Sequence, residues 1–488
     1  MKKRLKIGAY ALLIAFAVLF FCTKSSPGYP INDWADANIY LTIGKGMTQG
    51  DVVYRDLYDH KGPLLYALHA LCALISFSDF TGVFVMEVLL AAAFLMCVYR
   101  LLENCGSEKS AWVLLPLIML LVYASVSFAE GDSAEEMCLP LAAGTLAGVT
   151  GYLQSGQKRM RTGQLILHGA LTGCVFWIKF TMIGLHAGLL GWVLLRHLFR
   201  REWKAFWHSL GWLAAGFGLA AVPWAVYFGL NGAIGDWLKV YLYDNLFLYS
   251  AGEGLSTAGR LKAMALCFAE WFIRNPGYTL LTALGMVWYL LRRKDECGAV
   301  WMMAGLGALA TFIGGKSYPY YGLALAACAP AGLVPLGQWM EKHLTGRRTL
   351  AAGALAAAIG IALSPVLSPN MHADYGAPFG SPREETMQYR VAAVIGETPG
   401  ASLLNYGFMD AGFFTASGLT PTVKYFHQTN VPLEEMIREQ QRYIEEGLCD
   451  YVVTRGKHPE SIYQHYELAA EVNTPNLWYE KVYLFRKK

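Results

Sequence analysis

Long apolar runs that are almost free of charge restrict the fold of this chain more than any other feature. They include residues 7–22, 83–98 and 350–367. A helix of about 20 apolar residues spans the hydrocarbon core of a bilayer and satisfies its own backbone hydrogen bonds there. Only 16% of the residues are charged, against about a quarter in soluble domains. The sequence therefore predicts an all-α protein that crosses a membrane many times.

The first apolar run is predicted to be a retained span and not a cleaved signal peptide. Ten further apolar segments follow it, and its end at residues 21–24 reads Phe-Cys-Thr-Lys. That sequence lacks the small residues of a typical cleavage site. The chain should therefore keep this segment as its first transmembrane helix.

Along the chain, connections rich in lysine and arginine alternate with connections that hold few of them. Nineteen lie at residues 2–6, 100–109, 158–161, 196–204, 292–294 and 342–348, whereas the other, longer connections hold ten. Because cytoplasmic loops are rich in these residues, we predict a cytoplasmic N-terminus and an odd number of spans. The eleven predicted spans lie near residues 7–23, 83–102, 111–128, 137–153, 163–178, 181–199, 209–230, 276–291, 297–314, 317–335 and 350–367. The apolar segment 64–76 is too short to cross and is predicted to lie in the outer interface.

The character of the sequence changes after residue 367, where apolar runs shorten and charges and prolines appear. We predict a transmembrane catalytic domain at residues 1–367 and a small extracytoplasmic α/β domain at residues 368–488. Within the second domain, strands are expected at residues 402–406, 450–454 and 479–486, and helices at residues 433–446 and 459–470. Most of the ten cysteines lie inside apolar runs without metal-binding spacing, so they are interpreted as small buried hydrophobes.

With this topology, many ionisable residues gather at the outer face of the membrane. The first outer loop carries Asp33, Asp36, Asp51, Arg55, Asp56, Asp59, His60 and Lys61, and the second carries Glu130, Asp132, Glu135 and Glu136. Lys179 lies between two apolar spans, and Glu87 lies one turn inside another. A lysine at that depth is costly unless it is paired or faces water, so Lys179 is a candidate functional residue.

Carboxylates and lysines beside lipid indicate chemistry on a lipid phosphate. A carboxylate can take the proton from an attacking hydroxyl, and lysine can stabilise a departing phosphate. A phosphate leaves as an anion, so it needs no general acid. A glycosidase expels an alcohol instead and needs two paired carboxylates. The pattern therefore favours sugar transfer from a polyprenyl-phosphate donor.

The first outer loop makes a family resemblance specific. It reads Asn-Asp-Trp-Ala-Asp-Ala-Asn-Ile-Tyr at residues 32–40 and Tyr-Arg-Asp-Leu-Tyr-Asp-His-Lys-Gly-Pro-Leu-Leu-Tyr at residues 54–66. This resembles the membrane glycosyltransferases of the GT-C superfamily. The similarity is greatest to the branch of the aminoarabinose-lipid A transferases and the protein O-mannosyltransferases (family 39-like). That branch has an acidic residue followed by a tyrosine after the first span, and then a lysine-proline motif that begins an external helix.

The resemblance implies a role for each matching residue. Asp36 matches the catalytic aspartate that activates the acceptor hydroxyl, and Lys61 matches the lysine that contacts the donor phosphate. Glu135 or Glu136 stands where the family has a second acid, and Asp33 remains a rival base. Lys179 and the aromatic patch of Tyr318, Tyr320 and Tyr321 match more loosely. Further candidates are Arg55 and Lys316 for the phosphate, and Tyr40 and Tyr58 for the pocket of donor or acceptor.

Two positions depart from the family pattern. Asp36 is followed by Ala37 where many members have a second acid, and Lys61 is followed by Gly62 where they have proline. The missing acid weakens any inference of metal dependence. No cofactor is required by the sequence, and the participation of a divalent cation stays open.

The resulting prediction is an inverting glycosyltransferase at the outer face of the cytoplasmic membrane. Its partners would be a polyprenyl-phosphate monosaccharide, membrane lipid and a cell-envelope glycan, lipid-linked saccharide or teichoic-acid-like acceptor, with no nucleic acid.

A transporter or flippase is a first alternative, but it would place charges near the midplane and often shows repeats. A polysaccharide ligase or polymerase is a second, but its late external loop is expected to hold arginines and a histidine. The longest late loop here, residues 231–262, has only Arg260. A non-catalytic scaffold would leave Lys179 unexplained.

Overall fold

The computed structural model describes residues 2–249, 256–292, 294–345, 347–373, 376–398, 400–474 and 481–488. The chain divides into two compact units. The first unit comprises residues 1–23, 87–223 and 255–371, and the second comprises residues 24–86, 224–254 and 372–488. The predicted domain boundary at residues 367/368 stays a prediction.

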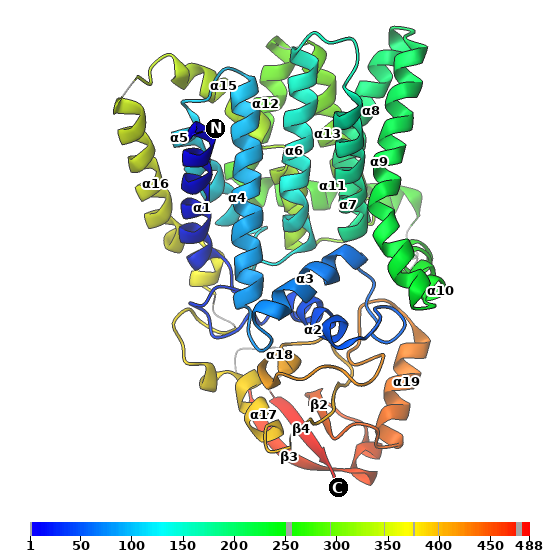
Figure 1. The fold of residues 1–488 in the computed structure, drawn as a ribbon. Coiled ribbons are helices and arrows are strands. Elements are labelled where there is room, and N and C mark those ends of the chain that lie inside the picture. The colour runs from blue at the N-terminus through cyan, green and yellow to red at the C-terminus, as the bar shows by residue number, and fades with distance from the viewer. Residues whose placement is uncertain are drawn as a thin grey trace. The chain divides into compact units, whose positions relative to one another are not determined.

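The first unit is a bundle of helices that run nearly parallel to one another (Figure 1). Its helices are α1 (Lys2–Cys22), most of α4 (Thr81–Asn104), α5 (Ala111–Tyr123), α6 (Ala134–Gln154), α7 (Thr162–Ile178), α8 (Ile183–Phe199), most of α9 (Trp203–Leu230), α11 (Thr257–Arg274), α12 (Pro276–Arg292), α13 (Lys294–Phe312), α14 (Leu323–Ala326), α15 (Pro330–Glu341) and α16 (Arg347–Leu367). Short 3₁₀ turns, η1 (Phe180–Met182) and η3 (Pro319–Gly322), precede α8 and α14.

Five helices in the described residues are long and apolar enough to cross a membrane, and a bent pair of helices is a sixth candidate. The five are Lys2–Cys22, Thr81–Asn104, Phe180–Phe199, Trp203–Leu230 and Arg348–Leu367; the bent pair is Pro319–Ala326 with Pro330–Glu341. These findings support a multi-spanning membrane protein, and the predicted number of eleven spans stays a prediction.

Glycines allow the helices of the first unit to pack closely. A methyl group at Gly184 or Gly188 of α8 would lie 2.3 Å from the carbonyl oxygen of Leu306 or Met302 on α13. Small residues at helix contacts are typical of membrane proteins, in which close packing replaces the hydrophobic effect.

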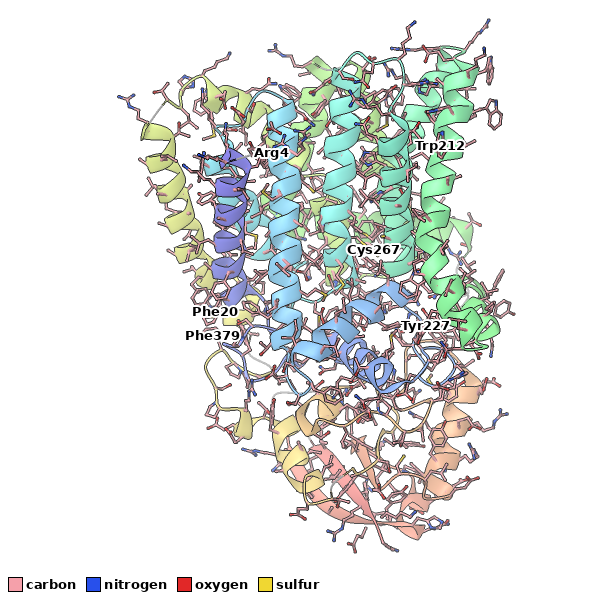
Figure 2. The ribbon with its side chains drawn as sticks, viewed as in Figure 1. Arg4, Phe20, Trp212, Tyr227, Cys267 and Phe379 are labelled. Atoms are coloured by element: carbon pink, nitrogen blue, oxygen red, sulfur yellow. The ribbon has the colours of Figure 1, made fainter. Side chains whose placement is uncertain are left out.

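Charged side chains of the first unit form ion pairs at the end of the bundle where α1 begins. Arg4 pairs with Glu103 at 3.0 Å, and Lys3 pairs with Glu108 at 2.6 Å. The ends of other helices add pairs of Lys109 with Glu341 and of Arg196 with Asp295. Figure 2 shows Arg4 near one end of α1 and Phe20 near the other. The basic clusters noted in the sequence thus include residues that meet at one end of the bundle.

The second unit combines helices with a small mixed sheet. Its elements are α2 (Ala35–Gln49), α3 (Pro63–Ile75), α10 (Ile234–Trp237), a π-helix η2 (Leu238–Tyr249), α17 (Met387–Ile395), α18 (Phe413–Ser417) and α19 (Glu434–Glu445), with strands β1 (Leu403–Asn405), β2 (Tyr451–Arg455), β3 (Tyr466–Asn473) and β4 (Lys481–Lys487). The strand order is β1-β2-β4-β3, with β1 parallel to β2 and the other pairs antiparallel. Figure 1 shows α17 and α19 beside this sheet.

The elements expected after residue 400 are confirmed with one exception. Strands at residues 403–405 and 451–455, the helix at 434–445 and the last strand at 481–487 form as predicted; residues 479–480 of that strand lie outside the described residues. The predicted helix at residues 459–470 is wrong. A 3₁₀ turn covers Glu460–Gln464, and Tyr466–Asn473 is a strand. This segment pairs with β4 from Tyr466 opposite Lys487 to Asn473 opposite Lys481, and such pairing overrides local helix propensity.

The segment interpreted as a late external loop, residues 231–262, is mostly helical where it is described. It contains α10, η2 and the start of α11, and residues 250–255 lie outside the described residues. The sequence interpretation missed α11 because that helix is amphipathic and carries Arg260, Lys262, Glu270 and Arg274.

Candidate functional site

Asp36 lies in the first turn of α2, close to the partial positive charge of the helix N-terminus. The side chain of Tyr40, one turn later, donates a hydrogen bond of 3.0 Å to Asp36 Oδ2. The Nζ atom of Lys61 lies 3.6 Å from the same oxygen and 5.7 Å from the centre of the Tyr40 ring. Asp36 is 7% exposed. The structure therefore brings together three predicted site residues as one nearly buried group.

The backbone of Lys61 is held on both sides by tyrosines. The Tyr54 hydroxyl donates to the Lys61 carbonyl oxygen at 2.6 Å, and the Lys61 amide donates to the Tyr66 hydroxyl at 3.0 Å. Pro63 then begins α3 directly after Gly62, as proline favours at the first helical position. These contacts fix the loop and leave the lysine side chain directed at Asp36.

Asp59 and His60 supply buried charge next to Lys61. Asp59 Oδ2 accepts a 2.6 Å hydrogen bond from Tyr66, and its Oδ1 lies 3.1 Å from His60 Nδ1. Burial alone would raise the pKa of Asp59, but His60 and the charge of Lys61 hold it well below its usual range. Burial and Lys61 also lower the pKa of His60. Asp59 is therefore expected to carry its negative charge beside Lys61.

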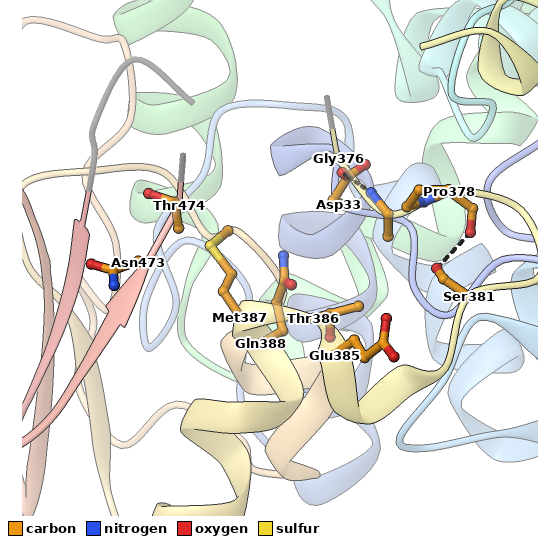
Figure 3. A pocket seen from close by; sticks show the side chains of 11 residues that line it. Asp33, Gly376, Pro378, Ser381, Glu385, Thr386, Met387, Gln388, Asn473 and Thr474 are labelled. Carbon is orange, nitrogen blue, oxygen red and sulfur yellow. Dashed lines mark hydrogen bonds between the residues drawn. The ribbon is translucent and has the colours of Figure 1, made fainter. Parts of the chain in front are cut away.

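Asp33, the rival base, is engaged elsewhere. Its Oδ1 accepts a 2.6 Å hydrogen bond from Lys24, and its Oδ2 accepts one of 3.2 Å from the Ala377 amide. Asp33 lines a cavity of about 300 Å³ together with residues 376–378, 381, 385–388 and 473–474 (Figure 3). Both of its oxygens therefore have partners within the second unit, and neither partner is Lys61.

Two other candidates of the first outer loop have partners of their own. Arg55 binds Asp56 with two hydrogen bonds and donates to the Asn231 carbonyl oxygen. The Tyr58 hydroxyl donates to Asp244 Oδ2 at 3.1 Å. These contacts explain the positions of Arg55 and Tyr58 without a ligand.

In the first unit, Lys179 forms a buried ion pair with Glu135. The backbone at Lys179 is extended where α7 ends, which aims the side chain into the bundle. Its Nζ lies 4.8 and 4.7 Å from the ring centres of Tyr320 and Tyr321, distances at which aromatic rings attract a cation. Tyr318 stacks on Tyr320 with ring centres 5.4 Å apart. Lys179 and the three tyrosines, which match the family pattern more loosely, thus lie together in one group.

Glu136 points to a different set of groups from Glu135. Its Oε2 accepts a hydrogen bond from the Asp132 amide, which also donates to Glu87. Thr23 donates to both oxygens of Glu87. The structure separates the two adjacent acids: Glu135 pairs with Lys179, and Glu136 lies among acids.

Lys316 lies half-buried in the connection between α13 and η3. Among the described residues, no group of three or more His, Cys, Asp or Glu side chains is arranged to hold a metal ion.

Comparisons with known proteins show similarity in part of the sequence and in the fold. Residues 60–227 match the family model described as dolichyl-phosphate-mannose-protein mannosyltransferase. The fold resembles ArnT from Cupriavidus metallidurans bound to undecaprenyl phosphate, with a TM-score of 0.60 and 14% sequence identity over 98% of this chain and 97% of that chain. The resemblance to the GT-C glycosyltransferases is confirmed.

Other structures share the GT-C fold with this chain. Oligosaccharyltransferase from Archaeoglobus fulgidus, solved with zinc and sulfate, has a TM-score of 0.52 and 13% identity over 91% of this chain and 68% of that chain. Arabinofuranosyltransferase AftD from Mycobacteria has a TM-score of 0.50 and 16% identity over 99% of this chain and 41% of that chain. No match was found among curated protein sequences.

Sequence reasoning did not assign a role to several residues that shape this candidate site. Tyr54 and Tyr66 stood in the quoted motif without a role, and Asp59, which is 2% exposed, was named among the loop charges without a role. A signal was available, because Asp59 and Tyr66 flank the lysine–glycine–proline turn, where side chains can satisfy loop amides.

Proposed function

We propose that the chain transfers a monosaccharide from a polyprenyl-phosphate donor to a hydroxyl acceptor, with inversion at the anomeric carbon. The carrying observation is the group of Asp36, Tyr40 and Lys61, which joins a carboxylate and a cation in one nearly buried place. Support also comes from ArnT bound to undecaprenyl phosphate and from Archaeoglobus fulgidus AglB with a dolichol phosphate.

In the proposed reaction, the acceptor oxygen attacks the anomeric carbon, and the bond from that carbon to the phosphate oxygen breaks. Asp36 takes the proton of the acceptor hydroxyl as a general base. Lys61 stabilises the negative charge that develops on the departing polyprenyl phosphate. Tyr40 orients the carboxylate through its hydrogen bond.

Glu135, Lys179 and the tyrosines at residues 318, 320 and 321 are proposed as a second functional group of the first unit. Its support is the burial of the ion pair and the aromatic rings around the cation. We assign Lys179 to phosphate contact, as the resemblance implies.

The proposal places the protein in the cytoplasmic membrane with eleven spans, the N-terminus inside and the C-terminal domain outside. The acceptor would be a cell-envelope glycan, a lipid-linked saccharide or a teichoic-acid-like polymer. The alternation of basic connections supports this orientation.

The test is transfer of labelled sugar from a synthetic polyprenyl-phosphate donor to membrane extracts, with wild type and Asp36→Asn at matched expression. Asp36→Asn should lose about 3 kcal/mol of transition-state stabilisation, or about a hundredfold in rate. Equal rates would remove Asp36 from the mechanism. Absence of transfer by the wild type from several donors and extracts would count against the proposed reaction.

A further inference from the structure

The helix that carries the candidate base presents two different polar faces. Asp36 and Tyr40 are four residues apart, and so lie on one face. Asn38, Thr42 and Lys45 follow the spacing of a second face. At about 100° per residue, the two faces point about 180° apart. The rotation of α2 therefore decides whether Asp36 meets Lys61.

The second face of α2 forms hydrogen bonds with residues 405–415. Thr42 donates to Asp410 Oδ2 at 2.9 Å, and Lys45 Nζ donates to the Phe414 carbonyl oxygen at 2.9 Å. The Thr415 hydroxyl donates to Asn38 Oδ1 at 3.1 Å. Asn38, Thr42, Lys45, Asp410 and Thr415 are all 0% exposed. We call these contacts the polar seam of α2.

The partners of α2 in this seam are themselves fixed. Asp410 Oδ1 accepts hydrogen bonds from Asn405 at 2.9 Å and from the Gly412 amide at 3.1 Å. Asn405 is the last residue of β1, which pairs with β2 of the sheet. The seam therefore connects α2 to the sheet through Asp410.

The burial of the seam favours a single orientation of α2. A buried donor or acceptor without a partner is costly, because no water replaces the lost hydrogen bond. Three such bonds at successive turns of one face resist both rotation and sliding of the helix. A shift of about 1 Å at a catalytic group can cost about a hundredfold in rate.

We propose that residues 405–415 position the catalytic helix, so that the C-terminal part of the chain holds Asp36 in contact with Lys61. This inference rests on the proposed function, and it gives the C-terminal part a role in the reaction that its sequence does not reveal. Thr42 and Asp410 act here as positioning residues.

The first test compares Thr42→Val with Thr42→Ser in the full-length protein. Valine keeps the shape of threonine but removes the donor to Asp410, whereas serine keeps the hydroxyl. We expect Thr42→Val to lower kcat about tenfold with KM for the donor within about twofold, and Thr42→Ser to restore most of kcat. Thr415→Val, on the other side of the seam, should give the same result.

Thr454→Val is the matched control. Thr454 lies on β2, is 0% exposed, and its hydroxyl has no hydrogen-bond partner among the residues that the structure describes. The same substitution there should leave kcat unchanged. A loss in Thr454→Val equal to that in Thr42→Val would show a general response to changes in the core and overturn the proposal.

Two further measurements separate this inference from the proposed function. In an Asp36→Asn background, Thr42→Val should cause no additional loss, because the seam acts through Asp36. Amide hydrogen exchange of residues 36–49 should be faster in Thr42→Val than in Thr454→Val, and this readout needs no activity. Unchanged exchange, or unchanged kcat in an active wild-type background, would overturn the positioning role. An inactive wild type with faster exchange in Thr42→Val would instead count against the proposed reaction alone.

Discussion

Lys61 can be substituted without loss of the hydrogen bonds that fix its loop, because Tyr54 and Tyr66 contact only its backbone through those bonds. Lys61→Gln is expected to lower kcat/KM for the donor by about 10- to 100-fold, since the developing phosphate charge loses its cation. Lys61→Arg should retain more activity. Initial rates at several donor concentrations measure this. Lys457→Gln, an exposed lysine of the same unit, should match the wild type, and normal rates in Lys61→Gln would exclude Lys61 from donor recognition.

Glu135 and Lys179 depend on each other for burial. Lys179→Met should destabilise the protein by about 3–5 kcal/mol, because it leaves the Glu135 carboxylate buried without its partner. The double variant Lys179→Met with Glu135→Leu should recover most of that stability but no transfer activity. Thermal unfolding in detergent, with activity measured in parallel, tests both points. Full activity of the double variant would reduce the pair to a structural role.

The sequence allowed prediction of site residues where the motif is local. Asp36 and Lys61 could be found because a loop motif spans both of them. The partner of Lys179 could not, since Glu135 lies 44 residues earlier and the sequence does not separate it from the adjacent Glu136. Only the direction of the first turn of α6 separates Glu135 from Glu136.

At the level of elements, α2 carries the buried Lys45, which makes the free energy of unfolding of the protein depend on pH. Burial lowers the pKa of Lys45 to about 7, against about 10.4 for an unfolded chain. Below pH 7, Lys45 is protonated in both the folded and the unfolded protein, so it contributes no change of stability with pH. Between pH 7 and about 10 the unfolded state binds more protons, so stability rises with pH.

Lys45→Met should remove this pH dependence. From pH 7 to pH 9, the free energy of unfolding of the wild type should rise by about 2 kcal/mol relative to that of Lys45→Met. Thermal unfolding of both proteins across this range measures the shift. A constant difference would show that Lys45 titrates normally in the folded state.

The elements that the sequence predicted poorly are those whose partners lie far away in the chain. Residues 466–473 have the composition of a helix but form a strand, because β4 offers a neighbouring edge. The amphipathic α11 was hidden by its charges. By contrast, the apolar helices were predictable because their signal lies in their own residues.

At the scale of the whole molecule, the predicted orientation can be tested with introduced cysteines. Lys457→Cys should react with a membrane-impermeant maleimide in intact cells, whereas Gln157→Cys should react only after permeabilisation. Both positions are exposed. The native Cys449 should stay unlabelled, because burial raises the pKa of its thiol to about 12. The reverse labelling pattern would invert the proposed topology.

The three separate segments of the second unit have a consequence for synthesis. Thr42 and Lys45 leave the ribosome long before their partners Asp410 and Phe414, which lie 368 and 369 residues later. At about 5–20 residues per second, this interval lasts about 20–70 s. During that time α2 can pack against α3 but lacks the polar seam that, in our proposal, fixes its rotation. If the proposals hold, a chain truncated before residue 405 would contain every candidate catalytic residue and still be inactive, so only completed chains would carry out the proposed transfer.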